Sequence, residues 1–122
     1  MPIFYKGTVT ATVDDRFVPG SVTTDIRKAL VWKERLESKK TKGAARHVTK
    51  GKSCVVMFSY EGELNDHSEF QRPGVSEHDR GNCWMAADKT QAQINTKVRN
   101  VRILTNAEVE STIQRLNQKH LF

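Results

Sequence analysis

The chain has 122 residues, of which 37% are hydrophobic and 28% are charged, and its formal net charge is +6. This length and balance are typical of a globular protein and predict a single domain over residues 1–122. The sequence has no apolar run long enough for a transmembrane helix, and its start lacks the layout of a secretory signal. We therefore expect a cytoplasmic protein without membrane contact.

The first predicted element is a strand or strand pair within residues 3–13, where β-branched and aromatic residues partly alternate. The next is a helix over about residues 24–39, whose apolar residues recur at helical spacing. Thr23 or Thr24 is its expected N-cap, and Asp25 suits the first turn because a negative charge there complements the helix dipole.

The middle of the chain is predicted to be strand and loop. Residues 54–58 form a continuous apolar run, which is typical of a strand buried on both faces. Residues 65–82 are polar with Pro and Gly, and predict a long loop of the kind that often carries function. A short strand or turn is expected at 83–87, and one or two strands are expected within 91–105.

The last predicted element is a helix over about residues 106–120. Thr105 and Glu108 have the T-x-x-E spacing of a capping box, and apolar residues follow at helical spacing. The predicted fold class is therefore α+β, with a mixed or antiparallel sheet and helices near the start and at the end.

The sequence lacks the familiar motifs for phosphate binding, dinucleotide binding and zinc proteolysis. Cys54 and Cys83 are far apart and neither belongs to a C-x-x-C pair, so we expect free thiols, with Cys54 buried. His67 and His78 lie among carboxylates in residues 61–79, but no spacing fixes a coordination geometry. No metal site is predicted.

Charge is unevenly distributed along the chain. Residues 39–52 contain no acid and are a candidate surface for nucleic acid or another anion. The basic residues of this segment are Lys39, Lys40, Lys42, Arg46, Lys50 and Lys52. Residues 61–79 are acidic and are a candidate surface for a protein partner. The plain alternative is that both are solvated loops.

Four segments in this order resemble the ADP-ribosyltransferase fold, especially small members such as the rifampin ADP-ribosyltransferases. "FYKGT" (Phe4 to Thr8) resembles the first strand of that family, in which an aromatic precedes His or Arg and then Gly. "SVTTDIRKALVW" is similar to the second strand and the helix after it, and "SCVVMFSYEGEL" to the third strand. "AQINTKVRNVRIL" looks like the late strand that begins at a catalytic Glu.

The resemblance implies a protein that binds NAD or an ADP-ribosylated group, or that transfers ADP-ribose from NAD. In that family, backbone groups of the first-strand Gly hold the nicotinamide, and a carboxylate near the ribose stabilises the developing positive charge. Carried over by position, the catalytic candidates are Lys6, Gln91 and Gln93, and the cofactor-binding candidates are Tyr5, Gly7, Thr8, Ser21, Thr23, Thr24 and Trp32.

Two features depart from the family pattern. Lys6 stands where His or Arg is expected, and a lysine lacks the planar fork of an arginine. Gln91 and Gln93 stand where the Glu is expected, and an amide supplies no negative charge. Other acids that are candidates for a displaced carboxylate are Glu61, Glu63 and Asp88. We expect a degenerate member that binds without turnover, or an enzyme with a displaced acid.

Other function classes remain open from the sequence. The first is a small basic binding or inhibitor protein that contacts nucleic acid, or a nucleic-acid enzyme, through residues 39–52, with salt-dependent affinity. The second is a factor that binds a protein through residues 61–79. A ribonuclease is a weaker alternative, for which Arg46, His47, Glu61 and His67 offer acid and base groups without a distinctive spacing.

Overall fold

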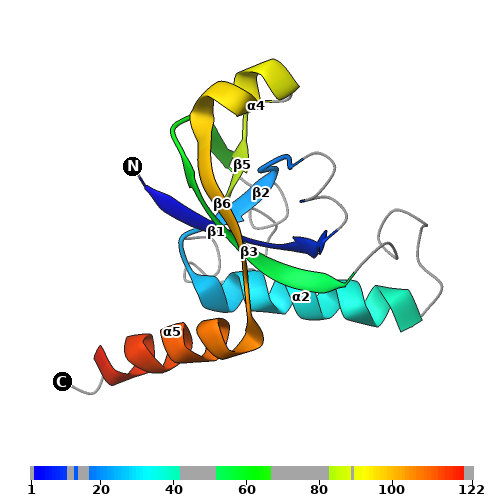
Figure 1. Cartoon of the computed structure of the whole chain (residues 1–122), viewed down its shortest axis with the longest axis vertical. Helices are drawn as coiled ribbons and strands as arrows, with labels where there is room; N and C mark the ends of the chain where they lie inside the picture. Colours follow the sequence, from blue (N-terminus) through cyan, green and yellow to red (C-terminus); the bar gives the residue numbers. More distant parts are fainter. Residues whose placement is uncertain are drawn as a thin grey trace.

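The computed structural model describes residues 2–10, 13, 17–41, 52–66, 83–88 and 90–119. The strands are β1 (Ile3–Val9), β2 (Ser21–Thr23), β3 (Ser53–Tyr60), β4 (Leu64–Asp66), β5 (Cys83–Ala86) and β6 (Val98–Leu104), and the helices are α2 (Ile26–Thr41), α4 (Gln91–Lys97) and α5 (Asn106–Lys119). The strands form one sheet in the order β4-β5-β2-β1-β3-β6, with antiparallel pairing throughout. The predicted α+β class is confirmed (Figure 1).

Helices α2 and α5 lie on the same side of the sheet, as Figure 1 shows. Between them and the sheet lies one core, formed by Ile26 and Ala29 of α2, Val55 of β3, Leu104 of β6 and Val109 of α5. Burial of these aliphatic side chains is the main favourable term that holds the helices to the sheet. Within the described ranges, no helix is both long enough and apolar enough to cross a membrane.

A second core lies on the opposite face of the sheet and is rich in aromatic residues. Phe4 of β1 pairs in register with Phe58 of β3, and their rings approach to 6.2 Å between centroids. Phe17, which precedes β2, packs edge-on against Phe58 with centroids 4.9 Å apart. Because strand side chains alternate between faces, Lys6 and Thr8 share this face with Phe4.

Gly7 allows α2 to pack directly on β1. A Cβ atom at this position would lie 2.4 Å from the carbonyl oxygen of Ala29 and 2.6 Å from the backbone nitrogen of Lys33. Both are backbone atoms of α2, so the clash could not be relieved by a side-chain rotation. Any larger residue would therefore push the helix off the strand.

The start of α2 corrects one detail of the sequence interpretation. Ser21 to Thr23 form β2, so only the end of "SVTTD" caps the helix. Asp25 is the capping residue: its Oδ1 accepts hydrogen bonds of 3.0 Å from the backbone N–H and from Nε of Arg27. Thr23 supports it, because its Oγ1 accepts the N–H of Asp25 at 3.0 Å. The helix itself was predicted and is confirmed.

The capping box predicted for α5 is also confirmed. The backbone N–H of Glu108 donates to Oγ1 of Thr105 at 3.1 Å, and the N–H of Thr105 donates to Oε1 of Glu108 at 3.2 Å. These reciprocal bonds satisfy two donors that a helix N-terminus otherwise leaves unpaired. They fix where the helix predicted over about 106–120 begins.

The prediction of one or two strands within residues 91–105 was wrong for the first half of that range. Residues Gln91–Lys97 form the helix α4, and strand structure begins only at Val98. A second capping box explains the difference: Oγ1 of Thr90 accepts the N–H of Gln93, and the Gln93 side chain accepts the N–H of Thr90. Ile94, only 2% exposed, anchors the short helix.

Strand β6 is one edge of the sheet, and its pairing is irregular. The register with β3 shifts between Met57 and Ser59. Asn100 has a φ of 57°, in the left-handed region that asparagine tolerates better than most residues. Val101 and Ile103 of this strand are exposed, at 38% and 37%. The strand therefore carries a bulge beside its exposed apolar side chains.

Candidate nucleotide-binding site

Strands β1 and β2 touch at one point and then part. Their pairing is limited to Tyr5 opposite Thr23, whereas β1 and β3 stay in register from Ile3 to Val9. The ladder between β1 and β2 therefore ends before Gly7.

The backbone direction of Gly7 follows from the ladder on the other side of β1. The N–H of Thr10 donates to the carbonyl of Lys52, and the N–H of Tyr60 donates to the carbonyl of Pro2. In an antiparallel pair the N–H and C=O of one residue point the same way, and successive residues alternate. Even-numbered residues of β1 thus face β3, and the N–H and C=O of Gly7 face the side of β2, where the pairing has stopped.

Lys6 ties β1 to the segment that leads into β2. Its Nζ donates to the carbonyl oxygens of Val18 at 3.1 Å and Pro19 at 2.8 Å. Burial of the ammonium group lowers the pKa of Lys6 to about 8. Gly20 lies beside this contact with a φ of 53°, and a Cβ there would approach Nζ to 2.9 Å. This carbonyl clamp holds the entry to β2 next to Lys6.

The residues that the resemblance implies for cofactor binding, together with the catalytic candidate Lys6, divide between the two faces of the sheet. The face away from α2 carries Lys6 and Thr8, whereas the helix-covered face carries Tyr5, Gly7, Thr23 and the half-buried Trp32, which lies against Gly7. Thr24 is exposed just before α2, and the hydroxyl of Ser21 donates to the sulfur of Met85 on β5 at 3.3 Å. These side chains do not converge on one point.

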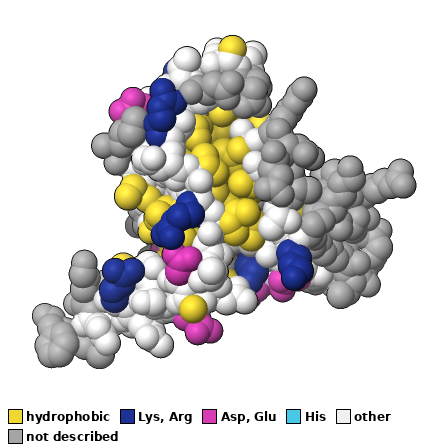
Figure 2. All heavy atoms as spheres, in the orientation of Figure 1, with side chains coloured by type: hydrophobic (Ala, Val, Ile, Leu, Met, Phe, Trp, Pro, Cys, Tyr) yellow, Lys and Arg dark blue, Asp and Glu magenta, His cyan; other side chains and the backbone are white. Residues whose placement is uncertain are grey.

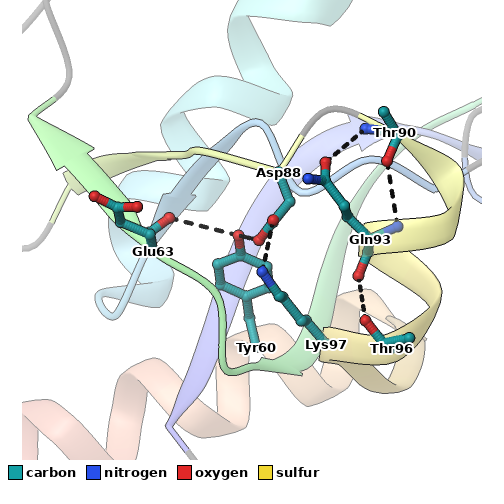
Figure 3. Close-up of polar contacts among 7 residues, drawn as sticks. All are labelled: Tyr60, Glu63, Asp88, Thr90, Gln93, Thr96 and Lys97. Atoms are coloured by element: carbon teal, nitrogen blue, oxygen red, sulfur yellow. Dashed lines mark hydrogen bonds and ion pairs between the residues drawn. The ribbon is translucent and has the colours of Figure 1, made fainter.

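The two glutamines expected at the catalytic position belong to α4. Gln93 uses its side-chain oxygen to cap that helix through the N–H of Thr90, at 3.3 Å (Figure 3). Gln91 is the first residue of the helix, and its side chain lies outside the described residues. The structure thus gives Gln93 a local role in helix capping.

A carboxylate that the sequence could not place, Asp88, is buried and forms a polar cluster with Tyr60 and the partly exposed Lys97. The hydroxyl of Tyr60 donates to Oδ2 of Asp88, and Nζ of Lys97 lies 2.8 Å from Oδ1 (Figure 3). Asp88 is only 6% exposed. The cluster joins the end of β3, the residues after β5 and the last turn of α4.

The pKa values in this cluster are shifted in opposite directions. Hydrogen bonds from Lys97 and Tyr60 lower the pKa of Asp88, because they stabilise the charged carboxylate. Burial, together with the hydrogen bond to Asp88, raises the pKa of Tyr60 to about 12. At neutral pH the cluster therefore holds an ionised Asp88 and a neutral Tyr60. No sequence pattern predicts this association, because residues 60, 88 and 97 share no motif.

The other charged segments lie mostly outside the described residues. Of the basic segment 39–52, Lys39 and Lys40 belong to α2 without described side chains, Lys52 is exposed before β3, and Lys42, Arg46 and Lys50 are not described. The acidic segment is described only as far as residue 66, and His67 and His78 fall beyond it. Nucleic-acid contact through 39–52 and protein contact through 61–79 stay predictions.

Searches against family models, curated proteins and solved structures each found no match.

Proposed function

We propose that this chain binds NAD or an ADP-ribosylated group at Gly7, where β1 and β2 part, in the manner of an ADP-ribosyltransferase. The observation that carries the proposal is the end of the β1–β2 ladder after Tyr5 and Thr23, with the N–H and C=O of Gly7 directed to the unpaired side. The resemblance of "FYKGT" to the first strand of that family assigns nicotinamide recognition to these same backbone groups.

The chemistry of a carboxamide suits this position. The nicotinamide carboxamide has an N–H donor and a carbonyl acceptor side by side, and Gly7 offers a C=O acceptor and an N–H donor on one side of the strand. Such a ligand would continue the hydrogen-bond ladder along β1 beyond the point where the pairing with β2 ends. The ammonium group of Lys6, one residue away, would attract a pyrophosphate as a point charge, although two carbonyls already hold it.

Binding without transfer is the better supported form of this function. Transfer needs a free carboxylate near the ribose, where positive charge develops. The carboxylate of Asp25 is engaged by Arg27 at 3.0 Å, and that of Asp88 by Tyr60 and Lys97. The other candidate acids, Glu61 and Glu63, follow the end of β3 that pairs with Ile3, which is the end of β1 away from Gly7. Gln93, which stands near the expected position of the acid in the sequence, caps α4. We therefore propose a binding protein of the family type, with the acid site degenerate.

The test is an NMR titration of the isotope-labelled protein with nicotinamide and with NAD. The amide resonance of Gly7 should shift with both ligands in a saturable way. Nicotinic acid is the matched control: its carboxylate offers no donor to the carbonyl of Gly7, and it should leave that resonance in place. The proposal is contradicted if the Gly7 amide resonance does not shift with nicotinamide or NAD, or if it shifts as much with nicotinic acid as with nicotinamide.

Two further readouts separate recognition from catalysis. Lys6→Met should weaken NAD and leave nicotinamide unaffected, because only NAD carries the pyrophosphate. The same samples are assayed for free nicotinamide released from NAD, and we expect none above the buffer control. Substitution of Gly7 itself is unsuitable, because any Cβ there meets the backbone of α2.

A further inference from the structure

We propose that the groove between β6 and α5 binds a small organic anion, one with an apolar body and a single carboxylate or phosphate group. The groove has a volume of about 360 Å³ and is lined from β1, β3, β6 and α5. It lies on the helix-covered face of the sheet and is a separate site from the backbone of Gly7. Tyr5 of "FYKGT" and Glu108 of the capping box are among its lining residues, but neither motif nor the proposed nucleotide site accounts for the two arginines that also line it.

The floor of the groove is apolar. Tyr5, Met57 and Leu104 line it from the sheet, and Ala107 lines it from α5. Tyr5 and Met57 are only partly buried against the adjoining core, so they have surface left to contact a ligand. A volume near the lower end of the range for small-molecule sites suits a single ring or a short aliphatic chain.

The first cation of the groove is Arg102, and Glu108 holds its guanidinium group in place. Nη1 of Arg102 lies 2.7 Å from Oε2 of Glu108. The other oxygen of Glu108 accepts the N–H of Thr105 in the capping box, so this carboxylate cannot turn away. Because a guanidinium group has five N–H donors, Arg102 keeps donors beyond the one used here. The salt bridge therefore positions Arg102 without using up its donors.

The second cation is Arg115, two helical turns after Glu108. Its Nη2 donates to Oγ1 of Thr112 at 3.3 Å, and that hydroxyl in turn donates to the carbonyl of Glu108 at 2.8 Å. Arg115 and Thr112 both line the groove, as does the exposed Ser111. The rim thus combines a second guanidinium group with the hydroxyl of Ser111, which can donate to an anion, whereas the hydroxyl of Thr112 already donates to Glu108.

The charge balance of the lining selects an anion. Two arginines face one glutamate, and a hydrogen bond from the backbone of Thr105, with the charge of Arg102, lowers the pKa of Glu108. The lining therefore carries one net positive charge at neutral pH. Figure 2 shows basic side chains next to an acidic one where β6 meets α5. A guanidinium group binds carboxylate and phosphate oxygens in a two-pronged geometry, which a neutral ligand cannot match.

The experiment measures binding of four probes to the full chain by NMR titration: benzoate, phenyl phosphate, the neutral benzamide, and inorganic phosphate. Benzoate or phenyl phosphate should bind in a saturable way and shift the resonances of Leu104 and Ser111. Benzamide and inorganic phosphate should bind at least about tenfold more weakly, because benzamide lacks the anionic group and inorganic phosphate lacks the apolar body. The better of benzoate and phenyl phosphate identifies the acidic group.

Three variants test the arginines. Arg102→Gln and Arg115→Gln should each weaken the better probe by about tenfold or more, the usual effect of losing a charge-assisted hydrogen bond. Arg99→Gln is the matched control: it removes the same charge from the same strand as Arg102, at a residue that does not line the groove. Its affinity should stay within about twofold of the parent.

Several results would overturn the inference. One is the absence of saturable binding by both benzoate and phenyl phosphate. Another is equal affinity for inorganic phosphate and phenyl phosphate, because the apolar floor would then contribute nothing. A third is an equal loss in Arg99→Gln. Arg102→Gln removes the counter-charge of Glu108 and could unfold the protein. In that case the affinity of Arg115→Gln still tests the inference. Nicotinamide binding at Gly7 is read from a different resonance, so either proposal can fail alone.

Discussion

The hydroxyl of Tyr60 donates to the carboxylate of Asp88, and the backbone of Gly62 passes so close that no side chain fits beside them. A Cβ at position 62 would lie 2.0 Å from the Tyr60 hydroxyl oxygen and 2.2 Å from Oδ2 of Asp88. This contact joins residues 28 apart in the sequence. It therefore holds the turn after β3 against the residues that follow β5.

Gly62→Ala should therefore destabilise the protein by at least about 2 kcal/mol, because the new methyl group must displace a buried hydrogen bond. Urea unfolding followed by circular dichroism measures this difference. Glu61→Ala is the matched control, since Glu61 is the exposed neighbour in the same turn, and it should change stability by less than about 0.5 kcal/mol. Equal effects of the two variants would contradict the close approach at Gly62.

Ionisation of Tyr60 should lower the free energy of unfolding at high pH. Its folded-state pKa is raised from 10.0 to about 12. A group with a raised pKa contributes stability that is present below the unfolded pKa and lost as pH rises through the folded value. The unfolding free energy should therefore fall between about pH 10 and 12, by about 2–3 kcal/mol from this group. Tyr60→Phe should remove that part of the slope, and an unchanged slope would count against the burial of this hydroxyl.

Lys97→Met should make the protein more sensitive to acid. Lys97 is the first cause of the lowered pKa of Asp88, which contributes stability above the unfolded pKa of 3.8 that is lost as pH falls through the folded value. Without Lys97 the folded pKa of Asp88 rises, so acid unfolding should begin at higher pH. Lys52→Met, at an exposed lysine before β3, is the control and should leave the acid midpoint in place. Acid titration of tryptophan fluorescence measures both.

Lys6 should have the opposite pH dependence from Tyr60. Its folded-state pKa is lowered from 10.5 to about 8, so between these values the unfolded chain binds more protons than the folded one. The stability that this group contributes then rises with pH across that window. Between about pH 8 and 10.5, the free energy of unfolding of the parent should therefore rise relative to that of Lys6→Met. A constant difference would show that the ammonium group is not desolvated.

The sequence predicted what local signals determine. The helices after residue 24 and after residue 105 were found because capping residues and apolar spacing lie within a few positions of one another. Helix α4 was missed although Thr90 and Gln93 have the same capping spacing, because the β-branched residues that follow favoured a strand. The same type of signal thus succeeded or failed according to its neighbours.

The sequence could not predict contacts between distant segments. Asp88 was a candidate acid, but its partners Tyr60 and Lys97 come from β3 and α4, and only the folded sheet brings them together. Gly7 was selected for its place in "FYKGT", and the sequence does not reveal that α2 packs against it. The groove at Arg102 and Arg115 depends on the angle between β6 and α5, which no local pattern specifies.

The bulge in β6 limits how this protein can assemble. A second chain that added to this edge would need to match the register shift opposite Met57 and the left-handed residue Asn100. A regular strand cannot do so over its full length, and Arg99 and Arg102 would oppose the same charges in an identical copy. Although Val101 and Ile103 are exposed on this edge, the irregular backbone leaves an added strand only short stretches along which it could pair.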